Sequence, residues 1–317
     1  MSKQAMESTL SKDMPFFMYF ENWVEQYKKG IIREVTLEKY FNDVRRIKEL
    51  SPGLLMKDID RTSYQRLLNE FGKTHSKQTT TDFHHHMKSC LLDALDDGVL
   101  EKDPTRKIVI KASNAGRGKK NFLSVKELNK LLGALELGNE LDGNWLIWLL
   151  AKTGMRFAEA MGLTPEDFDF KLKTINISKT WDYKITNDFA PTKNQSSVRV
   201  ISMDWEMVAR FSELVSKLPS GRPIFVPEGK KTFNSTYNAI LKKKCIEAGV
   251  KSISIHGLRH THASALFTSG VSMPSIAKRL GHSGTETTQR VYMHLINELE
   301  EKDRRLIQGA LSGITGT

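Results

Sequence analysis

Cysteine is scarce in this chain of 317 residues: there are two, Cys90 and Cys245, too far apart in sequence to resemble a metal-binding pair. We expect both to be reduced, buried thiols, as is typical of proteins of the reducing cytosol. Apolar runs are also short. None reaches the ~18 residues that a membrane span needs, and the first residues lack the apolar core of a signal peptide. These absences predict an intracellular protein with no membrane partner.

Metal-binding patterns are equally lacking. The sequence has no internal repeat and no cluster of carboxylates of the kind that two-metal nucleases use. The run His84-His85-His86 is the one tempting feature, but consecutive side chains on a helix point about 100° apart and cannot hold one ion well. We therefore expect no metal and no cofactor.

Charge of one sign is in excess. Lysine and arginine outnumber aspartate and glutamate by 48 to 37, which gives a formal net charge of +11. Most of the surplus lies in residues 113–317, which hold 29 basic and 20 acidic side chains. A basic balance favours a polyanionic partner, most often nucleic acid, and the chain is long enough for two domains.

The first part of the chain is predicted to be a helical domain, residues 15–110, after a short tail of residues 1–14. Thr36 is expected to cap the second of its helices, and the fourth should run from about Lys77 to Asp97. The apolar face of this fourth helix carries Phe83, Met87, Cys90, Leu91 and Ala94. Its polar face is a candidate contact for DNA and carries Gln78, Thr81, His85 and Lys88.

A basic, glycine-containing stretch, residues 111–121, is predicted to be an inter-domain linker, and its Lys119 and Lys120 are further candidate DNA contacts. The second domain, residues 122–317, opens with Ser124 and Glu127 in the spacing of a capping box.

Within this second domain, the sequence predicts a helix over Asn144–Met161 and two strands, Lys173–Lys184 and Ser197–Met203, with APTKNQS at the hairpin tip between them. Helices are expected to dominate from Trp205 onward. The fold class expected is mainly α with a small antiparallel β-sheet in the C-terminal domain.

Four local patterns in residues 150–295 carry candidate chemistry. Each by itself has an ordinary structural explanation, such as a capping arginine, a solvated basic face or a tyrosine at the edge of the core. The patterns are AKTGMRFAEAMGL around Arg156, APTKNQSSVRVIS around Lys193, IHGLRHTHAS with His256 and Arg259, and LGHSGTETTQRVYMH with His282 and Tyr292.

In their order and spacing these residues resemble the tyrosine recombinase, or phage integrase, family. The family pattern is an arginine, a lysine on a β-hairpin, His-x-x-Arg, a histidine or tryptophan, and then a tyrosine, and all six positions are matched. The resemblance implies a helical core-binding domain followed by a catalytic domain. It also implies site-specific cleavage and rejoining of DNA strands through a 3′-phosphotyrosyl intermediate, which integrates and excises mobile DNA without metal or ATP.

Phosphodiester exchange accounts for these residue types. Negative charge grows on the non-bridging phosphate oxygens, and the guanidinium groups of Arg156 and Arg259 can clamp those oxygens with planar, bidentate hydrogen bonds. The resemblance makes Tyr292 the nucleophile. Its phenol must lose a proton during attack, and His256, which titrates near neutral pH, is the candidate general base.

The remaining roles follow from the same resemblance. Lys193, on the expected hairpin, is the candidate general acid that protonates the leaving 5′-oxygen. Lys179 and Lys184 flank the same hairpin and stay open as alternatives, because strand register is not fixed by sequence. His282 is expected to bind the phosphate and to help position the nucleophile.

The long insert between the strands resembles integrases of phages and conjugative transposons from Gram-positive bacteria. Residues 1–14 are too few for the additional arm-binding domain of many such enzymes. Implied partners are double-stranded DNA with core-type sites, three further copies in a tetramer on synapsed DNA, and an accessory directionality factor, all in the bacterial cytoplasm at the nucleoid. The helix expected over residues 295–311 has an apolar stripe that can pack on its own domain, whereas the resemblance implies that it docks on a neighbouring protomer.

Three other functions stay open at this point. A housekeeping Xer-type recombinase and a type IB topoisomerase-like enzyme share much of this chemistry. A non-catalytic DNA-binding regulator on the same fold belongs to another class, and loss of the tyrosine or of an arginine would favour it.

Overall fold

The computed structural model describes residues 11–113, 121–284 and 307–308, and the chain divides into two compact units, residues 1–119 and 120–317. Among the described residues, no helix combines the length and the apolar character needed to cross a membrane.

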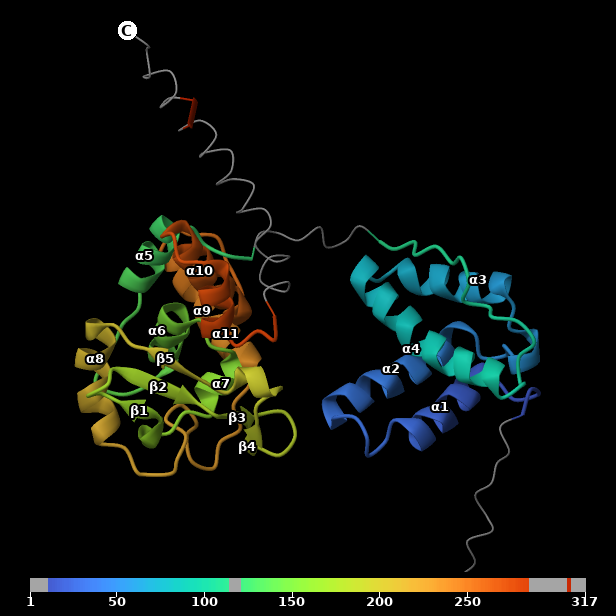
Figure 1. Cartoon of the computed structure of the whole chain (residues 1–317), viewed down its shortest axis with the longest axis horizontal. Helices are drawn as coiled ribbons and strands as arrows, with labels where there is room; N and C mark the ends of the chain where they lie inside the picture. Colours follow the sequence, from blue (N-terminus) through green and yellow to red (C-terminus); the bar gives the residue numbers. More distant parts are fainter. Residues whose placement is uncertain (1–10, 114–120, 285–306, 309–317) are drawn as a thin grey trace, which may run out of the picture. The chain divides into compact units, whose positions relative to one another are not determined.

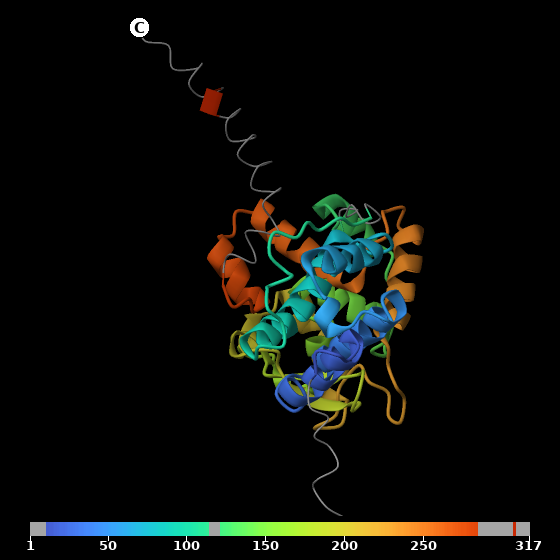
Figure 2. The same cartoon turned by 90° about the vertical axis from the view of Figure 1, so that its right-hand side faces the viewer.

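The described part of the first unit, residues 11–113, is a bundle of four helices, which Figure 1 and Figure 2 both show gathered together. Its elements are α1 (Phe16–Tyr27), α2 (Glu34–Leu50), a 3-10 turn η1 (Met56–Asp58), α3 (Arg61–Gly72) and α4 (Lys77–Asp96). The expected cap of α2 is wrong: Arg33 is the N-cap residue, so Thr36 lies inside the first turn. In contrast, Asp60 and Ser63 form a capping box at the start of α3.

The core of this unit is rich in aromatic side chains. Phe16, Tyr19, Phe20 and Trp23 of α1 are all buried, and each large side chain removed from water stabilises the fold by about 1.5–3 kcal/mol. The five apolar residues expected on the inner face of α4 are buried as well, so that prediction is confirmed. The polar side of α4 therefore remains on the surface.

The second unit combines helices with short strands. Its helices are α5 (Val125–Gly133), α6 (Gly143–Thr153), α7 (Phe157–Met161), α8 (Trp205–Ser216), α9 (Asn234–Glu247), α10 (Ile255–Thr268) and α11 (Met273–Leu280). Its strands are β1 (Phe168–Asp169), β2 (Thr174–Ile177), β3 (Lys179–Asp182), β4 (Asp188–Pro191) and β5 (Arg199–Ser202), with 3-10 turns η2 (Pro165–Asp167) and η3 (Gln195–Ser197). In Figure 1 the strands lie toward one end of this unit, while α5 and α10 lie toward the other.

The strands form two antiparallel sheets. One has the order β1-β2-β5, with Ile175 paired to Ile201, and the other is the hairpin β3-β4, inserted between β2 and β5. The predicted tip at APTKNQS is therefore wrong, because the chain turns at residues 183–187 and Pro191 lies within β4. The mainly α fold with a small antiparallel sheet is confirmed.

The continuous helix expected over Asn144–Met161 is also wrong. It is broken at Gly154, which adopts φ 66° as the C-cap of α6, and a second short helix starts at Phe157. Eight of the eleven α6 residues are buried, so this helix forms the centre of the unit. The expected capping box of Ser124 and Glu127 is present at the start of α5.

Candidate active site

Arg156 is presented by the break between α6 and α7. Gly154 makes the turn possible, since a Cβ at this position would lie 2.6 Å from Cδ2 of His262 and 2.9 Å from Cδ2 of Leu280. Arg156 then becomes the N-cap residue of α7, and its backbone N–H donates to Oε2 of Glu159 at 2.8 Å. The main chain of Arg156 is therefore fixed by the turn at Gly154 before it and by the side chain of Glu159 after it.

The Arg156 guanidinium is held by three elements. It donates to Oε1 of Glu159 at 2.7 Å, to Oγ of Ser197 at 3.2 Å and to the carbonyl oxygen of Gly281 at 3.0 Å. These partners come from α7, from η3 ahead of β5 and from the C-cap of α11. The side chain remains partly accessible, as a residue that is to bind a ligand must be.

Arg259 lies on α10 and is 4% exposed. Its guanidinium donates to the carbonyl oxygen of Gly154 at 2.8 Å and to that of Leu280 at 2.6 Å. Both carbonyl groups lie at helix C-termini, where the aligned peptide dipoles leave partial negative charge that attracts a cation. Arg156 and Arg259 therefore share a support, because they bind the consecutive carbonyl groups of Gly281 and Leu280.

Two histidines lie within electrostatic range of these arginines. His256 precedes Arg259 by one helical turn, and its ring meets that of His260 edge-on at 4.8 Å between centroids. Removal of solvent by the surrounding protein, and then the charges of Arg259 and Arg156, lower the pKa of His256, although its side chain remains exposed. The free protein therefore keeps this imidazole neutral at pH 7, in the state that can accept a proton.

His282 follows the C-cap of α11 directly. Gly281 has φ 69°, so the chain reverses at this residue and carries the half-buried His282 back beside the arginines. The pKa of His282 falls to about 4, first because of its burial and then because of the charges of Arg259 and Arg156. This ring too is neutral at pH 7.

Lys193 lies on the surface in the segment between β4 and η3, and not at the hairpin tip. Its neighbours tie this segment to the site: Oγ1 of Thr192 donates to the carbonyl oxygen of Asn194, whose side-chain oxygen accepts from Ser197. Ser197 in turn accepts a hydrogen bond from Arg156.

The two alternative lysines are placed differently. The ammonium of Lys179 forms an ion pair with Asp167 and donates to Oγ1 of Thr164 at 3.2 Å. Lys184 lies in the exposed turn between β3 and β4. The ammonium of Lys179 is thus held by a carboxylate of η2, and Lys184 extends from a solvent-exposed turn.

The remaining candidate residues lie elsewhere. Tyr292, Lys119 and Lys120 are outside the described residues, as is nearly all of the segment 295–311. In the first unit, the α4 positions Gln78 and His85 are exposed, and Thr81 and Lys88 are half-buried.

The three consecutive histidines point in different directions. His84 is buried, and its Nδ1 lies 2.8 Å from the hydroxyl of Tyr64, whereas Nδ1 of His86 lies 2.5 Å from a carboxylate oxygen of Asp43. His85 is exposed. Within the described ranges, no group of three or more histidine, cysteine or acidic side chains is arranged to hold a metal ion.

Sequence reasoning missed a buried network behind the arginines. Glu159, 1% exposed, accepts hydrogen bonds from Arg156 and also from Arg199 of β5, whose Nη1 and Nη2 lie 3.1 and 2.9 Å from its two oxygens. Burial by itself would raise the pKa of Glu159, but Arg199 and Arg156 together hold it below its ordinary value. The Arg-x-x-Glu spacing on a short helix was the available signal.

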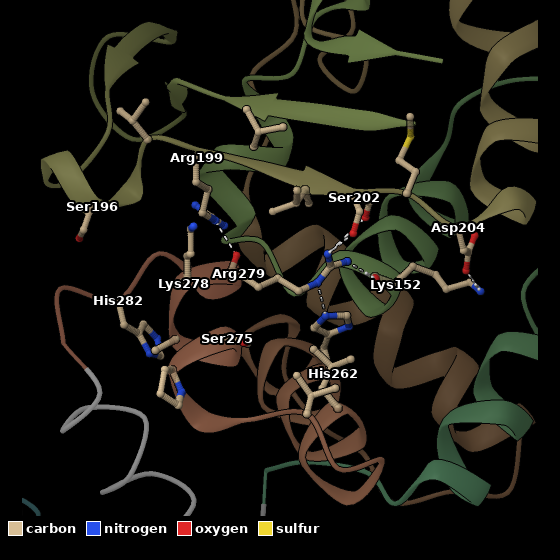
Figure 3. A pocket seen from close by; sticks show the side chains of 18 of the residues that line it. Lys152, Ser196, Arg199, Ser202, Asp204, His262, Ser275, Lys278, Arg279 and His282 are labelled. Atoms are coloured by element: carbon tan, nitrogen blue, oxygen red, sulfur yellow. Dashed lines mark hydrogen bonds and ion pairs between the residues drawn. The ribbon is translucent and has the colours of Figure 1, made fainter. Parts of the chain in front are cut away.

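A groove of about 1170 Å³ lies beside His282, between β5 and the helices α10 and α11 (Figure 3). Its apolar lining includes Val200, Leu266 and Val271, and its basic lining includes Lys278 and Arg279. Figure 3 shows the Arg279 side chain crossing the groove toward His262, whose Nε2 accepts from Nε of Arg279 at 3.0 Å. Burial, followed by the charge of Arg279, lowers the pKa of His262 to about 3, so this ring acts as a neutral acceptor.

Known proteins share both the sequence and the fold of this chain. The integrase of Staphylococcus phage L54a is 25% identical over 333 aligned residues, which cover 93% of this chain and 94% of the relative. The transposase from transposon Tn916 of Enterococcus faecalis is 22% identical and covers 82% of this chain and 69% of its own length.

Among solved structures, the Tn1549 transposon integrase in complex with transposon right end DNA has a TM-score of 0.76 at 18% identity, covering 92% of this chain and 99% of that one. A lambda integrase dimer bound to a core site has a TM-score of 0.66 at 13% identity, covering 88% and 77%. At these identities the structures show a shared fold.

The sequence profile of the phage integrase family matches residues 121–298, which is more than half of the chain and includes all six residues of the candidate site. The chain therefore belongs to the phage integrase family and is a site-specific tyrosine recombinase that cleaves and rejoins DNA.

Proposed function

We propose that this recombinase integrates and excises mobile DNA by attack of Tyr292 on a phosphodiester. The bond from the phenolic oxygen to phosphorus forms while the bond from phosphorus to the 5′-oxygen breaks, which leaves a 3′-phosphotyrosyl bond and a 5′-hydroxyl. Rejoining reverses these steps, so the energy of the phosphodiester is conserved and ATP is not consumed. The observation that carries this proposal is the pair Arg156 and Arg259, held together by the C-terminal carbonyls of α6 and α11.

The arginine pair would bind the non-bridging oxygens of the scissile phosphate. Fixed guanidinium groups stabilise the extra negative charge of the transition state without having to reorganise during the reaction. In this proposal the two arginines and Lys193 take the electrostatic role that metal ions have in other phosphoryl-transfer enzymes.

Proton transfer is assigned to His256 and Lys193. The lowered pKa of His256 keeps its ring neutral, so it can take the phenolic proton of Tyr292. Lys193 would give a proton to the leaving 5′-oxygen, and the surface segment that carries it is tied to Arg156 through Ser197. His282, neutral in the free protein, would donate a hydrogen bond to the phosphate and help position Tyr292.

The helical unit, residues 15–110, is proposed as a second DNA-binding domain. The α4 face with Gln78, Thr81, His85 and Lys88 is open to solvent or half-buried, and the linker lysines Lys119 and Lys120 add positive charge. Both units would contact the same duplex at a core-type attachment site, and the linker, residues 111–121, would join them. Such phosphate contacts make affinity fall steeply with salt.

Assembly is proposed as a tetramer on two synapsed duplexes, with the segment 295–311 of each copy docked on its neighbour. The groove beside His282 suits this segment. The apolar side chains of the groove could pack against Leu295, Ile296 and Leu299 of the segment. The basic side chains of the groove, Lys278 and Arg279, are complementary in charge to the acidic side chains of the segment, which are Glu298, Glu300, Glu301 and Asp303. Ile307, in the same segment, is exposed in the single chain. We also propose that an accessory factor sets the direction of the reaction and that the protein acts at the bacterial nucleoid.

The decisive experiment compares the protein with Tyr292→Phe on nicked duplexes taken from the DNA that flanks its gene. The substitution removes the nucleophilic oxygen and leaves the ring, so we expect covalent protein–DNA adduct in denaturing gels to disappear while binding stays within a few-fold. Two unlinked duplexes report strand exchange in the same assay. Persistent adduct in Tyr292→Phe would refute the assignment. Relaxation of a supercoiled plasmid that carries the same site, without strand exchange between duplexes, would indicate a topoisomerase, and binding without any adduct would indicate a regulator.

A further inference from the structure

Arg199 is a buried arginine, 9% exposed, on the strand β5. Its Nη1 and Nη2 donate to both oxygens of Glu159, and its Nη1 also donates to the carbonyl oxygen of Ser197 at 2.8 Å. Its Nε donates to the carbonyl oxygen of Arg279 at 2.6 Å, a contact visible in Figure 3. Three elements therefore hold this guanidinium in one orientation.

Arg199 also packs against the residue whose carbonyl holds Arg156. A Cβ on Gly281 would lie 2.8 Å from Nη1 of Arg199, so glycine is needed for this close approach. The backbone of Gly281 is thus held between Arg199, which packs against its Cα, and Arg156, which donates to its carbonyl oxygen at 3.0 Å.

The net charge of this cluster determines how strongly Arg156 can attract a phosphate. Glu159 carries one negative charge and has two arginine partners, so Arg156, Glu159 and Arg199 together carry a net charge of +1. Without Arg199, Arg156 and Glu159 would form a neutral pair. A buried pair of this kind attracts an anion far less than a cation does, because the carboxylate and the guanidinium act in opposition at short range.

We propose that Arg199 is a positioning residue for strand cleavage. Its guanidinium neutralises the negative charge of Glu159, so that the positive charge of Arg156 remains available to the scissile phosphate. This inference rests on the proposed role of Arg156. Arg199 itself does not touch the substrate, and its effect reaches the reaction through Glu159.

The first test is Arg199→Met in the full-length protein, measured as the single-turnover rate of covalent adduct formation on nicked duplex at saturating protein. We expect this rate to fall roughly 10-fold or more, but by less than the 10²–10³ that follows the loss of a direct transition-state donor. Binding of the same duplex, measured by gel shift, should stay within a few-fold. The matched control is Lys244→Met, which removes another buried, ion-paired cation of this unit, one bound to Glu136 and Glu247, and should cleave at the normal rate.

The second test is the double variant Arg199→Met with Glu159→Gln, which restores the net charge of +1 because it removes the carboxylate that would otherwise neutralise Arg156. We expect it to cleave roughly 10-fold faster than Arg199→Met, a rescue that a purely structural role does not predict. If Arg199→Met cannot be purified folded, the double variant decides alone. Cleavage within a few-fold of the wild-type rate supports the proposal, and a folded but slow double variant overturns it. Failure of the wild-type protein to form adduct would instead refute the proposed function.

Discussion

The buried arginine Arg259 offers the sharpest test of the phosphate clamp, through the variant Arg259→Lys. The substitution keeps the positive charge and most of the length of the side chain, but it replaces a planar fork with a single ammonium. In the free protein the fork spans the carbonyl oxygens of Gly154 and Leu280, at 2.8 and 2.6 Å. One ammonium cannot reproduce this geometry and also present two parallel N–H groups to a phosphate.

Two magnitudes follow from this geometry. A buried carbonyl left without its donor destabilises the fold by about 1–3 kcal/mol, which lowers the melting temperature but leaves most of the protein folded at 25 °C. Loss of one transition-state donor lowers the cleavage rate by about 10²–10³, equivalent to about 2.7–4 kcal/mol. The effect on the rate should therefore exceed the effect on folding.

The assay is the single-turnover rate of adduct formation on nicked duplex at a temperature well below the melting transition, with circular dichroism to measure the transition itself. Arg210→Lys, an exposed arginine of α8 paired with Glu206, is the matched control and should change neither quantity. A folded Arg259→Lys that cleaves at the rate of the unmodified protein would show that this guanidinium does not hold the scissile phosphate.

Three further predictions concern residues 295–317, His282 and the turn at Gly154 after α6. Removal of residues 295–317 should weaken assembly on synapsed DNA in native gels and alter cleavage, while a single copy still binds its site; unchanged assembly and cleavage would reject docking on a neighbour. The pKa of His282 is lowered to about 4 in the folded protein. The unfolded chain therefore binds a proton near pH 6.5 that the folded chain does not bind until about pH 4. The contribution of His282 to the free energy of unfolding is fully present above pH 6.5 and is lost as the pH falls toward 4. Melting temperatures from pH 7 to 4 should fall less steeply in His282→Asn, and equal slopes would contradict this contribution. Gly154→Ala forces a side chain into a left-handed turn against His262 and should destabilise the fold by about 1–3 kcal/mol in chemical denaturation; a neutral effect would show that the turn can relax.

Local patterns in the sequence were sufficient to predict several parts of the structure. The inner face of α4 and the capping box at Ser124 depend on residues three or four positions apart, which a helix brings together whatever the rest of the chain does. The spacing of His256 and Arg259 placed both on α10 for the same reason. The grouping of these residues with Arg156 and His282 came from resemblance, since they are brought together by the long-range packing of α6, α10 and α11.

The strand region could not be read in the same way. Residues 173–184 form one β-rich run in sequence, but the chain passes from one sheet to another at Ser178, and a single serine is too weak a turn signal to mark the change. In the run that leads into β5, the order Val198, Arg199, Val200 and Ile201 fits either face of the strand. The structure buries Arg199 and leaves Val200 64% exposed, because the charge of Glu159 lies on the inner side. Tertiary electrostatics thus overrides the apolar pattern.

The partners of the two site arginines explain how this chain can concentrate positive charge for an anionic substrate. A carboxylate would orient a guanidinium well but would cancel its charge, whereas a helix C-terminus offers only partial negative charge. Arg259 takes the second solution, through the carbonyl groups of Gly154 and Leu280. Arg156 takes the first, but its carboxylate is shared with Arg199, so positive charge remains in excess. Burial, and after it the positive charge of the arginines, lowers the pKa of both His256 and His282. In the proposed reaction, a bound phosphate would offset the part of this shift that comes from the arginines, so the same charges that attract the phosphate would no longer oppose protonation of a histidine once it is bound.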